Sequence, residues 1–197
     1  MKGALNSIHV NLQSNEFGKP AIRYSGRGFL LFRGMDMQVP FIGLRVVVPP
    51  EWIDVNGHMN ATRYGLAVYD AQVNLTEEIG MGEAYVRKYA CGKAVLESHM
   101  IYEREVALGD ELEIRSWLLA VDAKRLHFCH EVFNLSSNVR AAISEQVDIH
   151  IDLQKRRSSE LPPCLLAQLQ QRVRANLQLP LPDKLGSTLR PPKNTWL

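Results

Sequence analysis

Apolar residues are spaced along the chain in patterns that predict one strand followed by one long helix. Residues 41–48 form a largely apolar and β-branched run, which is typical of a strand. Pro49 and Pro50 end this run because neither residue can donate to a β-ladder. Between 61 and 79, apolar side chains recur every three or four residues on one stripe, and Gly80 follows them. These patterns predict a strand that leads into the longest helix of the chain.

Four further strands are expected after a short second helix at 83–89. Turn-like linkers join these strands, which favours antiparallel neighbours over crossover helices. The strands are expected at 93–106, 111–120, 124–134 and 139–153. The last of them alternates between an aliphatic face and a polar face. A strand, a long helix and four antiparallel strands predict an α+β fold with one sheet of about five strands.

The chain divides into three parts by composition. Residues 1–40 mix polar and small residues without a period and are expected to be an N-terminal extension; Met35 and Met37 are alternative candidate starts. Residues 41–153 carry the predicted folded domain. Residues 154–197 are expected to form a linker, a further helix and a tail that is either ordered by contact or disordered.

Composition indicates a soluble globular protein. The apolar fraction is 46%, and no apolar run is long enough to span a bilayer. The net charge of +2 is uneven, because residues 41–153 carry ten basic and seventeen acidic residues. That balance argues against nucleic-acid binding by the domain. Cys91, Cys129 and Cys164 have no metal-ligand spacing and follow no secretory signal, so we expect buried, inert thiols in a reducing cytoplasm.

The stretch 52–60 lies between the predicted strand and the long helix and is rich in polar and small side chains. Amides at a helix N-terminus have no intrahelical partner, and the helix dipole is positive there, so this junction could stabilise an oxyanion. Asp54 supplies a carboxylate, and Gly57 lacks a Cβ and would allow close approach by a ligand. The alternative is that Asp54 or Asn56 only caps the helix.

The junction belongs to a wider pattern that resembles the hotdog-fold acyl-CoA thioesterases of the 4-hydroxybenzoyl-CoA thioesterase type. Within that group, the chain is most similar to the betainyl-CoA thioesterases of carnitine catabolism. The resemblance implies a hotdog fold, in which an antiparallel sheet wraps one long helix, and hydrolysis of an acyl-CoA thioester, with betainyl-CoA as the specific candidate. It covers about 41–153 and rests on the sequences at 54–59, 97–99, 107–112, 124–127 and 142–152.

The resemblance also implies a catalytic role for the junction. Asp54 matches the family's catalytic aspartate, which would either attack the thioester carbonyl or activate water. Backbone amides near Gly57, His58 and Met59 would hold the developing oxyanion. His58 could also orient Asp54 or be a structural residue, and Asn56 could position water or substrate.

Three further polar residues are candidates of lower rank for the site. Two of them lie near or on the long helix, and the third lies on the last strand. Asn60 could position substrate, although an asparagine at a helix start needs no functional explanation. Asp70 is the alternative catalytic carboxylate, because some hotdog thioesterases use an acid from the central helix, but it could simply pair with Arg63. Glu145 lies on a mainly aliphatic strand face and is expected to need a partner.

A cationic acyl group would be recognised by negative charge and an aromatic wall. Glu97 and His99 match the resembled family and are candidates for the polar contacts; the alternative is a buried pair that fixes strand register. A trimethylammonium group favours aromatic faces, which Trp52, Tyr64 or Tyr69 could supply. Core packing is the alternative for each of these aromatic residues.

A basic cluster begins the strand at 124–134. Lys124, Arg125 and His127 could bind the phosphates of coenzyme A, also across a subunit boundary, or they could form a solvated surface. We expect a homodimer, with a tetramer as an alternative, because a sheet around one helix leaves an edge open for pairing. No metal or other cofactor is expected. A catalytically weak module that binds acyl-CoA or a protein partner is the alternative function.

Overall fold

The computed structural model describes residues 13–14, 20–21, 39–185, 189 and 191–197. The chain forms two compact units, Met1–Met35 and Asp36–Leu197. In the first unit, β1 (Gln13–Ser14) pairs with β2 (Pro20–Ala21) in antiparallel orientation. The expected N-terminal extension and its alternative starts lie mostly outside the described residues.

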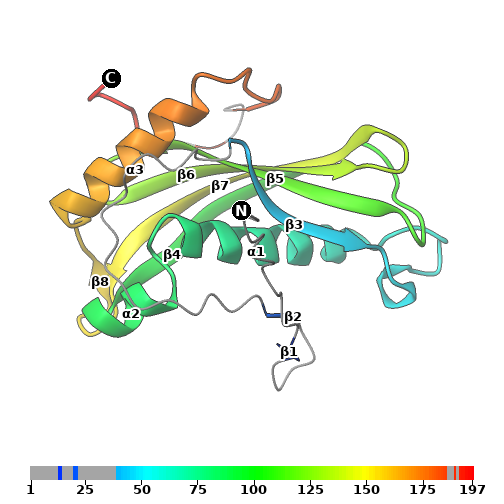
Figure 1. The fold of residues 1–197 in the computed structure, drawn as a ribbon, viewed down its shortest axis with the longest axis horizontal. Helices are drawn as coiled ribbons and strands as arrows, with labels where there is room; N and C mark the ends of the chain where they lie inside the picture. The colour runs from blue at the N-terminus through cyan, green and yellow to red at the C-terminus, as the bar shows by residue number, and fades with distance from the viewer. Residues whose placement is uncertain (1–12, 15–19, 22–38, 186–188, 190) are drawn as a thin grey trace, which may run out of the picture. The chain divides into compact units, whose positions relative to one another are not determined.

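The second unit consists of one curved sheet and three α-helices (Figure 1). Its helical elements are the short 3-10 helix η1 (Pro50–Trp52), α1 (Ala61–Glu78), α2 (Glu83–Tyr89) and α3 (Pro163–Asn176). Its strands are β3 (Phe41–Val47), β4 (Cys91–Tyr102), β5 (Glu111–Val121), β6 (Arg125–Asn134), β7 (Val139–Asp152) and β8 (Arg157–Ser158). The predicted long helix and the five long strands are confirmed.

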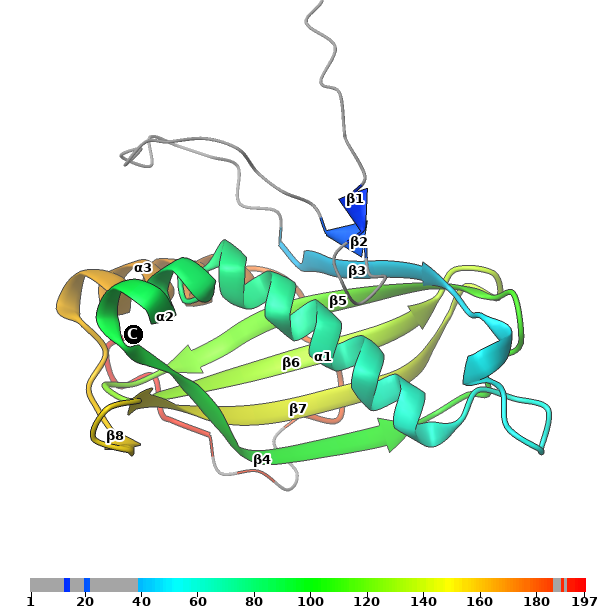
Figure 2. The same ribbon diagram turned by 90° about the horizontal axis from the view of Figure 1, so that it is seen from below.

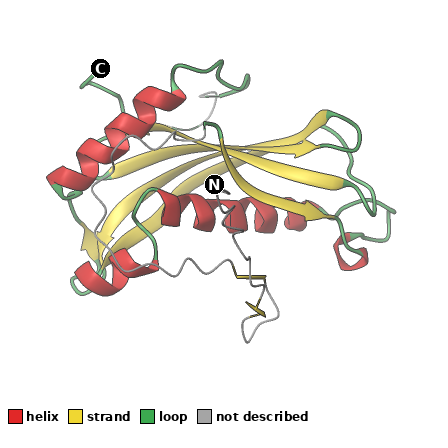
Figure 3. Ribbon diagram, viewed as in Figure 1, coloured by secondary structure: helices red, strands yellow, loops and turns green. Residues whose placement is uncertain are grey.

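The sheet is antiparallel, with strand order β3-β5-β6-β7-β4, and β8 adds to β7. Helix α1 runs along one face of this sheet, as Figures 1 and 2 show from two directions. Helix α3 packs along the end of β5 and shares a core cluster with the C-terminal part of α1; Figure 3 shows the helices and strands in different colours. One long helix against a curled antiparallel sheet is the arrangement that the resemblance to the hotdog fold predicts.

Helix α1 connects two core clusters. Tyr64, Ala67 and Ala71 pack in the first cluster, whereas Leu75 packs in the second cluster with α3. The helix also comes very close to β3, since a Cβ added at Gly43 would lie 2.8 Å from the Ala71 Cβ. Because α3 shares a core cluster with α1, the chain after 153 folds against the domain.

The end of β5 is covered by the C-terminal segment instead of a strand. β3 pairs with β5 only as far as Ser116, so the outer backbone groups of residues 118–121 need other partners. The Asn176 side chain donates to the Leu118 carbonyl at 3.0 Å. Nearer the end of the chain, Asn194 donates to the Leu119 carbonyl at 3.0 Å, and the Trp196 indole donates to the Val121 carbonyl at 2.8 Å. The tail is therefore ordered by contact at these residues.

One strand end differs from the sequence expectation. β4 ends at Tyr102 and not at 106, because the amides of Glu103 and Arg104 both donate to the Ala141 carbonyl and turn the chain away from the sheet edge. Helix α2 ends at Tyr89 as expected, and its C-cap residue Ala90 adopts the left-handed conformation.

The polar face of β7 lies toward the helices. Asp148 accepts a hydrogen bond from Lys93 at 2.6 Å, and His150 bonds to the Tyr85 hydroxyl at 2.9 Å. The aliphatic face of the same strand carries Ile143, which packs in a third cluster on the opposite face of the sheet. Both faces of β7 are thus buried.

Candidate functional site

The loop between η1 and α1 is a tight turn that presents the Asp54 carboxylate. Ile53 and Met59 form an isolated antiparallel bridge, which closes the loop at its base. Within the loop, the Asp54 amide donates to the His58 carbonyl at 3.0 Å, and the Gly57 amide donates to the Asp54 carbonyl at 3.0 Å. Gly57 has a φ of 82°, a conformation that other residues adopt at a cost. The glycine is therefore needed for the turn.

The Asp54 carboxylate is held by two donors. Its Oδ1 accepts from the Asn56 amide at 2.8 Å, and its Oδ2 accepts from the Asn60 side-chain amide at 3.3 Å. The Asn60 Oδ1 atom in turn accepts from the Thr62 amide at 2.9 Å and caps α1. The alternative that Asp54 or Asn56 caps the helix is therefore wrong: Asn60 is the cap, and it also binds Asp54.

The free amides at this junction differ from those expected. The Gly57 amide is used inside the loop, and the Met59 amide donates to the Val106 carbonyl at 2.8 Å. These two amides are thus occupied, which corrects the predicted set of oxyanion donors. Among the described residues, the amides of His58 and Ala61 have no hydrogen-bond acceptor, and both residues line a cavity beside Asp54. They are the donors left to bind a carbonyl oxygen.

This cavity has a volume of about 490 Å³ and lies between the loop, the first turns of α1 and the segment after β4. Tyr64 and Tyr102 stand edge to face within it, with ring centroids 5.3 Å apart. The Tyr64 hydroxyl donates to the Arg104 carbonyl at 3.3 Å. Burial, followed by the charge of Glu105, raises the pKa of Tyr64, so this hydroxyl stays protonated. The cavity wall therefore joins an aromatic pair to two glutamates and to Arg104, whose guanidinium donates to the Glu103 carbonyl at 2.6 Å.

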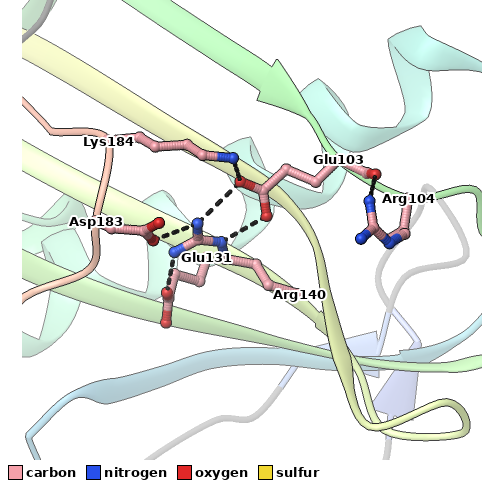
Figure 4. Close-up of polar contacts among 6 residues, drawn as sticks. All are labelled: Glu103, Arg104, Glu131, Arg140, Asp183 and Lys184. Carbon is pink, nitrogen blue, oxygen red and sulfur yellow. Dashed lines mark hydrogen bonds and ion pairs between the residues drawn. The ribbon is translucent and has the colours of Figure 1, made fainter.

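Glu103 lines the same cavity and belongs to a cluster of ion pairs (Figure 4). Arg140 donates to both of its carboxylate oxygens, at 2.8 and 2.9 Å, and the Lys184 ammonium lies 2.5 Å from Oε1. Arg140 also pairs with Glu131 and Asp183. The hydrogen bonds from Arg140 lower the pKa of Glu103 to about 2. The charge of Glu103 is thus compensated, and the cluster attaches the C-terminal segment to the cavity wall.

The structure places three other candidate residues away from this cavity. Trp52 packs on the first core cluster, so core packing is correct for it and a substrate contact is not supported. Tyr69 is 63% exposed and lines a second cavity, between α1 and β4. Asp70 lies on α1 and does not line the cavity of Asp54. Arg63 donates to the Glu51 carbonyl at 3.1 Å.

Glu97 and His99 are not brought together with Asp54. In the β4–β7 ladder, Glu97 lies opposite Val147 and His99 lies opposite Glu145. Neither Glu97 nor His99 lines the cavity. The β4 ladder has an irregularity at 95–97, so Val95 does not share the face of Glu97 and His99 but lines the second cavity. The expected polar contact between these two residues and an acyl group at Asp54 therefore has no support within one subunit.

The basic residues of the β6 start lie far from Asp54 in the same chain. β6 runs from Arg125 to Asn134, and only its far end, where Asn134 bonds to Asp110, approaches the Asp54 loop. At roughly 3.3 Å per residue, the strand separates the two ends by about 30 Å. Arg125 is also paired with Asp122.

The expectation that His127 binds a phosphate of coenzyme A is wrong. It is 6% exposed and bonds to Glu145 at 2.7 Å. Burial lowers the pKa of His127 despite the neighbouring carboxylate, so a buried histidine with an occupied Nε2 replaces the expected surface cation. His127 is therefore the partner that Glu145 was expected to need on its aliphatic strand face.

The sequence interpretation missed Tyr102 and Glu105, which line the cavity. Both lie within the strand expected at 93–106, and no motif marks them. The cysteines also differ from the expectation, since only Cys129 is buried, whereas Cys91 is half-buried and Cys164 is exposed. Burial raises the pKa of the Cys129 thiol.

The described residues lack two features. No group of three or more histidine, cysteine, aspartate or glutamate side chains is placed to hold a metal ion within those residues. No helix in the same residues combines the length and the apolar character that crossing a membrane requires.

Comparison with known proteins identifies the family. Residues 48–169 match the thioesterase-like superfamily. A betainyl-CoA thioesterase of Pseudomonas aeruginosa is 33% identical over 144 residues, which cover 72% of this chain and 89% of that protein. An L-carnitine dehydrogenase/betainyl-CoA thioesterase of Agrobacterium fabrum is 33% identical over 139 residues, which cover 71% of this chain but 28% of that longer protein.

Solved structures agree with this family. A putative thioesterase from Pseudomonas putida KT2440 superposes with a TM-score of 0.66 at 29% identity, covering 79% of this chain and 99% of that one. A hypothetical protein from Staphylococcus aureus in complex with CoA has a TM-score of 0.69 at 23% identity, covers 80% of this chain and 100% of that one, and shares the fold. The chain therefore belongs to the thioesterase-like superfamily and is an acyl-CoA thioesterase with the hotdog fold.

Proposed function

We propose that this thioesterase hydrolyses betainyl-CoA to betaine and coenzyme A, with Asp54 as its catalytic carboxylate. The observation that carries the proposal is the arrangement at the start of α1. There, Asp54 lines a cavity of about 490 Å³. His58 and Ala61, whose backbone amides have no hydrogen-bond acceptor among the described residues, line the same cavity. The betainyl part of the proposal is supported by the Pseudomonas aeruginosa relative.

The same carboxylate can act by two routes. In the first, Asp54 takes a proton from a water molecule, and the hydroxide attacks the thioester carbonyl carbon. In the second, Asp54 itself attacks that carbon and forms a mixed anhydride, which water then cleaves. In both routes the carbon–sulfur bond breaks, the thiolate of coenzyme A takes up a proton, and the amides of His58 and Ala61 stabilise the oxyanion.

Replacement of Asp54 tests the mechanism. Asp54→Asn keeps the size of the side chain and removes the base or nucleophile, so we expect kcat for betainyl-CoA to fall by about 10²- to 10⁴-fold. Free thiol release measures the rate, and thermal unfolding checks that the variant is folded. Asp70→Asn is the matched control, since it makes the same change on α1 outside the cavity.

Two results would contradict the proposal. Full activity of Asp54→Asn together with an inactive Asp70→Asn would move catalysis to the central helix. Tight binding of acyl-CoA by the folded wild-type chain without thiol release over a panel of acyl-CoA esters would favour the alternative of a binding module.

We also propose that the enzyme is a homodimer formed through β4. This strand lies at the edge of the sheet and pairs, in the part of the chain that the structure describes, with β7 alone. Beside it, a second cavity of about 640 Å³ lies between β4 and α1. Three large apolar side chains that line this cavity are between 42% and 63% exposed: Tyr69, Val73 and Val95. Exposed apolar area of this kind is typical of an interface.

Antiparallel pairing of two β4 strands would reverse one subunit relative to the other. The sheet end that carries Lys124 and Arg125 in one subunit would then lie on the side of the Asp54 cavity of its neighbour. This supports the prediction that these two residues bind coenzyme A phosphates across a subunit boundary. Light scattering on the purified chain at micromolar concentration should give twice the chain mass; a monomer that is fully active would contradict the dimer and this phosphate site together.

We place this activity in carnitine breakdown in the cytoplasm. The Agrobacterium fabrum relative joins an L-carnitine dehydrogenase to a betainyl-CoA thioesterase in one protein, which supports the pathway. The three free cysteines support a reducing compartment.

A further inference from the structure

The betainyl group is very short, and this restricts where its cation can bind. Its quaternary nitrogen is two covalent bonds, or about 2.5 Å, from the thioester carbonyl carbon. If that carbon lies beside Asp54, the trimethylammonium group must lie in the same cavity. Glu97 and His99 line no part of that cavity, so the cation needs other partners.

Tyr64 and Tyr102 give the cavity two aromatic walls at right angles. Their ring planes differ by 88°, and the ring centroids are 5.3 Å apart. Tyr64 is fixed, since it is 4% exposed and bonds to the Arg104 carbonyl, whereas Tyr102 is 53% exposed at the open side. A corner of this kind can contact a quaternary ammonium group on two sides.

Glu105 is the acidic side chain of this wall whose charge is not compensated. Glu103 is paired with Arg140 and Lys184, but Glu105 has no hydrogen bond or ion pair to any described residue. Glu105 lines the same cavity as Tyr64 and Tyr102, so it lies beside the aromatic corner. It can therefore offer a negative charge to a ligand.

The segment that carries Glu105 is held by its backbone. The amides of Glu103 and Arg104 donate to the Ala141 carbonyl at 2.8 and 3.1 Å, and the Val106 carbonyl accepts from the Met59 amide at 2.8 Å. These bonds tie the segment to β7 on one side and to the Asp54 loop on the other. Glu105 is thus set at a fixed position relative to Asp54.

We propose that Tyr102 and Glu105, together with Tyr64, bind the cationic head of the acyl group and make the enzyme selective for a quaternary ammonium acyl-CoA. This proposal rests on the proposed function, because it assumes that the thioester carbonyl binds at Asp54. The aromatic corner contacts the methyl groups, and Glu105 supplies the opposing charge.

The test compares betainyl-CoA with tert-butylacetyl-CoA, which has the same shape but no charge. For Tyr102→Leu, we expect the ratio of kcat/KM values, betainyl over tert-butylacetyl, to fall by about 3- to 30-fold. For Glu105→Gln, we expect a fall of about 3- to 10-fold that becomes smaller at high salt. The loss should appear mainly in KM. Tyr102→Phe keeps the aromatic face and should keep the ratio, and Glu111→Gln is a charge control at an exposed position outside the cavity.

The outcomes separate this proposal from the proposed function. A wild-type enzyme that does not prefer betainyl-CoA over its neutral analogue would overturn the assignment of the substrate. A wild-type enzyme with this preference, combined with unchanged ratios in folded Tyr102→Leu and Glu105→Gln, would overturn the cation site alone. Equal loss of both substrates in these variants would also overturn it, because it would indicate a structural role.

Discussion

Two aspartates lie near α1 and have opposite surroundings. Asp148 is fully buried, and its carboxylate accepts from Gln146 at 2.7 Å and from Lys93 at 2.6 Å. Asp54 lies at an open cavity and is held by a backbone amide and by the side chain of Asn60. The first carboxylate is enclosed by protein donors, and the second keeps one side available to a ligand.

Under the proposed function, this difference separates a carboxylate that stabilises the fold from one that takes part in the reaction. A charge under the helix must be paired inside the protein, because water cannot reach it. A charge at the start of the helix can remain partly solvated and can use amides that the helix leaves free. Changes near Asp148 should therefore act mainly on stability, and changes near Asp54 mainly on activity.

The largest effect is expected from Lys93→Met. This change leaves the Asp148 charge in the interior without its cationic partner, and should lower the free energy of unfolding by about 3–5 kcal/mol. Urea denaturation measures the loss, and thiol release per folded molecule at low temperature should stay near the wild-type rate. Lys93→Met combined with Asp148→Asn should recover part of the stability. If Lys93→Met abolished activity with normal stability, the separation of the two regions would be wrong.

A smaller effect, on the pH dependence of the free energy of unfolding, is expected from His130. This residue is buried on the same side of the sheet as Asp148 and bonds to Ser116 at 2.9 Å. Burial, with a contribution from Lys93, lowers the pKa of His130 to about 3. The unfolded chain therefore binds the proton below about pH 6.5 and the folded chain does not, so stability falls as the pH is lowered from 6.5 toward 3.

For this group alone, the loss approaches about 1.4 kcal/mol per pH unit. Urea denaturation at pH 7, 6 and 5 should show a shallower dependence in His130→Gln than in the wild type. Identical slopes would contradict this, because they would mean that the folded chain binds a proton at His130 as readily as the unfolded chain does.

The smallest change in stability is expected from replacement of Asn60, which both caps α1 and donates to the Asp54 carboxylate. Asn60→Ala removes the helix cap and should cost about 1 kcal/mol, and it also frees the Asp54 carboxylate, so kcat should fall. Asn60→Asp keeps a capping oxygen but places a second negative charge beside Asp54. It should keep most of the stability and still lose activity; a fully active Asn60→Asp would show that the bond to Asp54 is not needed.

The fold could be predicted well because its main signals are local. The helical spacing from 61, the prolines after β3 and the short linkers all describe the elements that the structure contains. The cover on the end of β5 could not be predicted, because Asn194 and Trp196 act through single hydrogen bonds to a strand more than 70 residues away. Such bonds leave no periodic pattern in a sequence.

The site could be predicted only in part. Asp54 was found because it stands in a dense motif before a helix. Tyr102 and Glu105 were missed because the strand was expected to continue to 106, which would have placed their side chains on strand faces. Glu97 and His99 were expected in the site from the resemblance, but strand register places them elsewhere. Sequence motifs thus located the carboxylate that we propose as the reacting group, whereas the proposed contacts to the acyl group depend on where β4 ends.

The close approach of β3 and α1 has a consequence for engineering of the enzyme. At Gly43 the helix has no room to move toward the strand, since even a methyl group would meet Ala71. The Asn74 side chain also donates to the Gly43 carbonyl at 2.7 Å, which ties the helix to the strand at this point. A library that aims at bulkier acyl groups should therefore keep both partners of this contact and vary the tyrosines of the cavity, because added space cannot come from a shift of the helix.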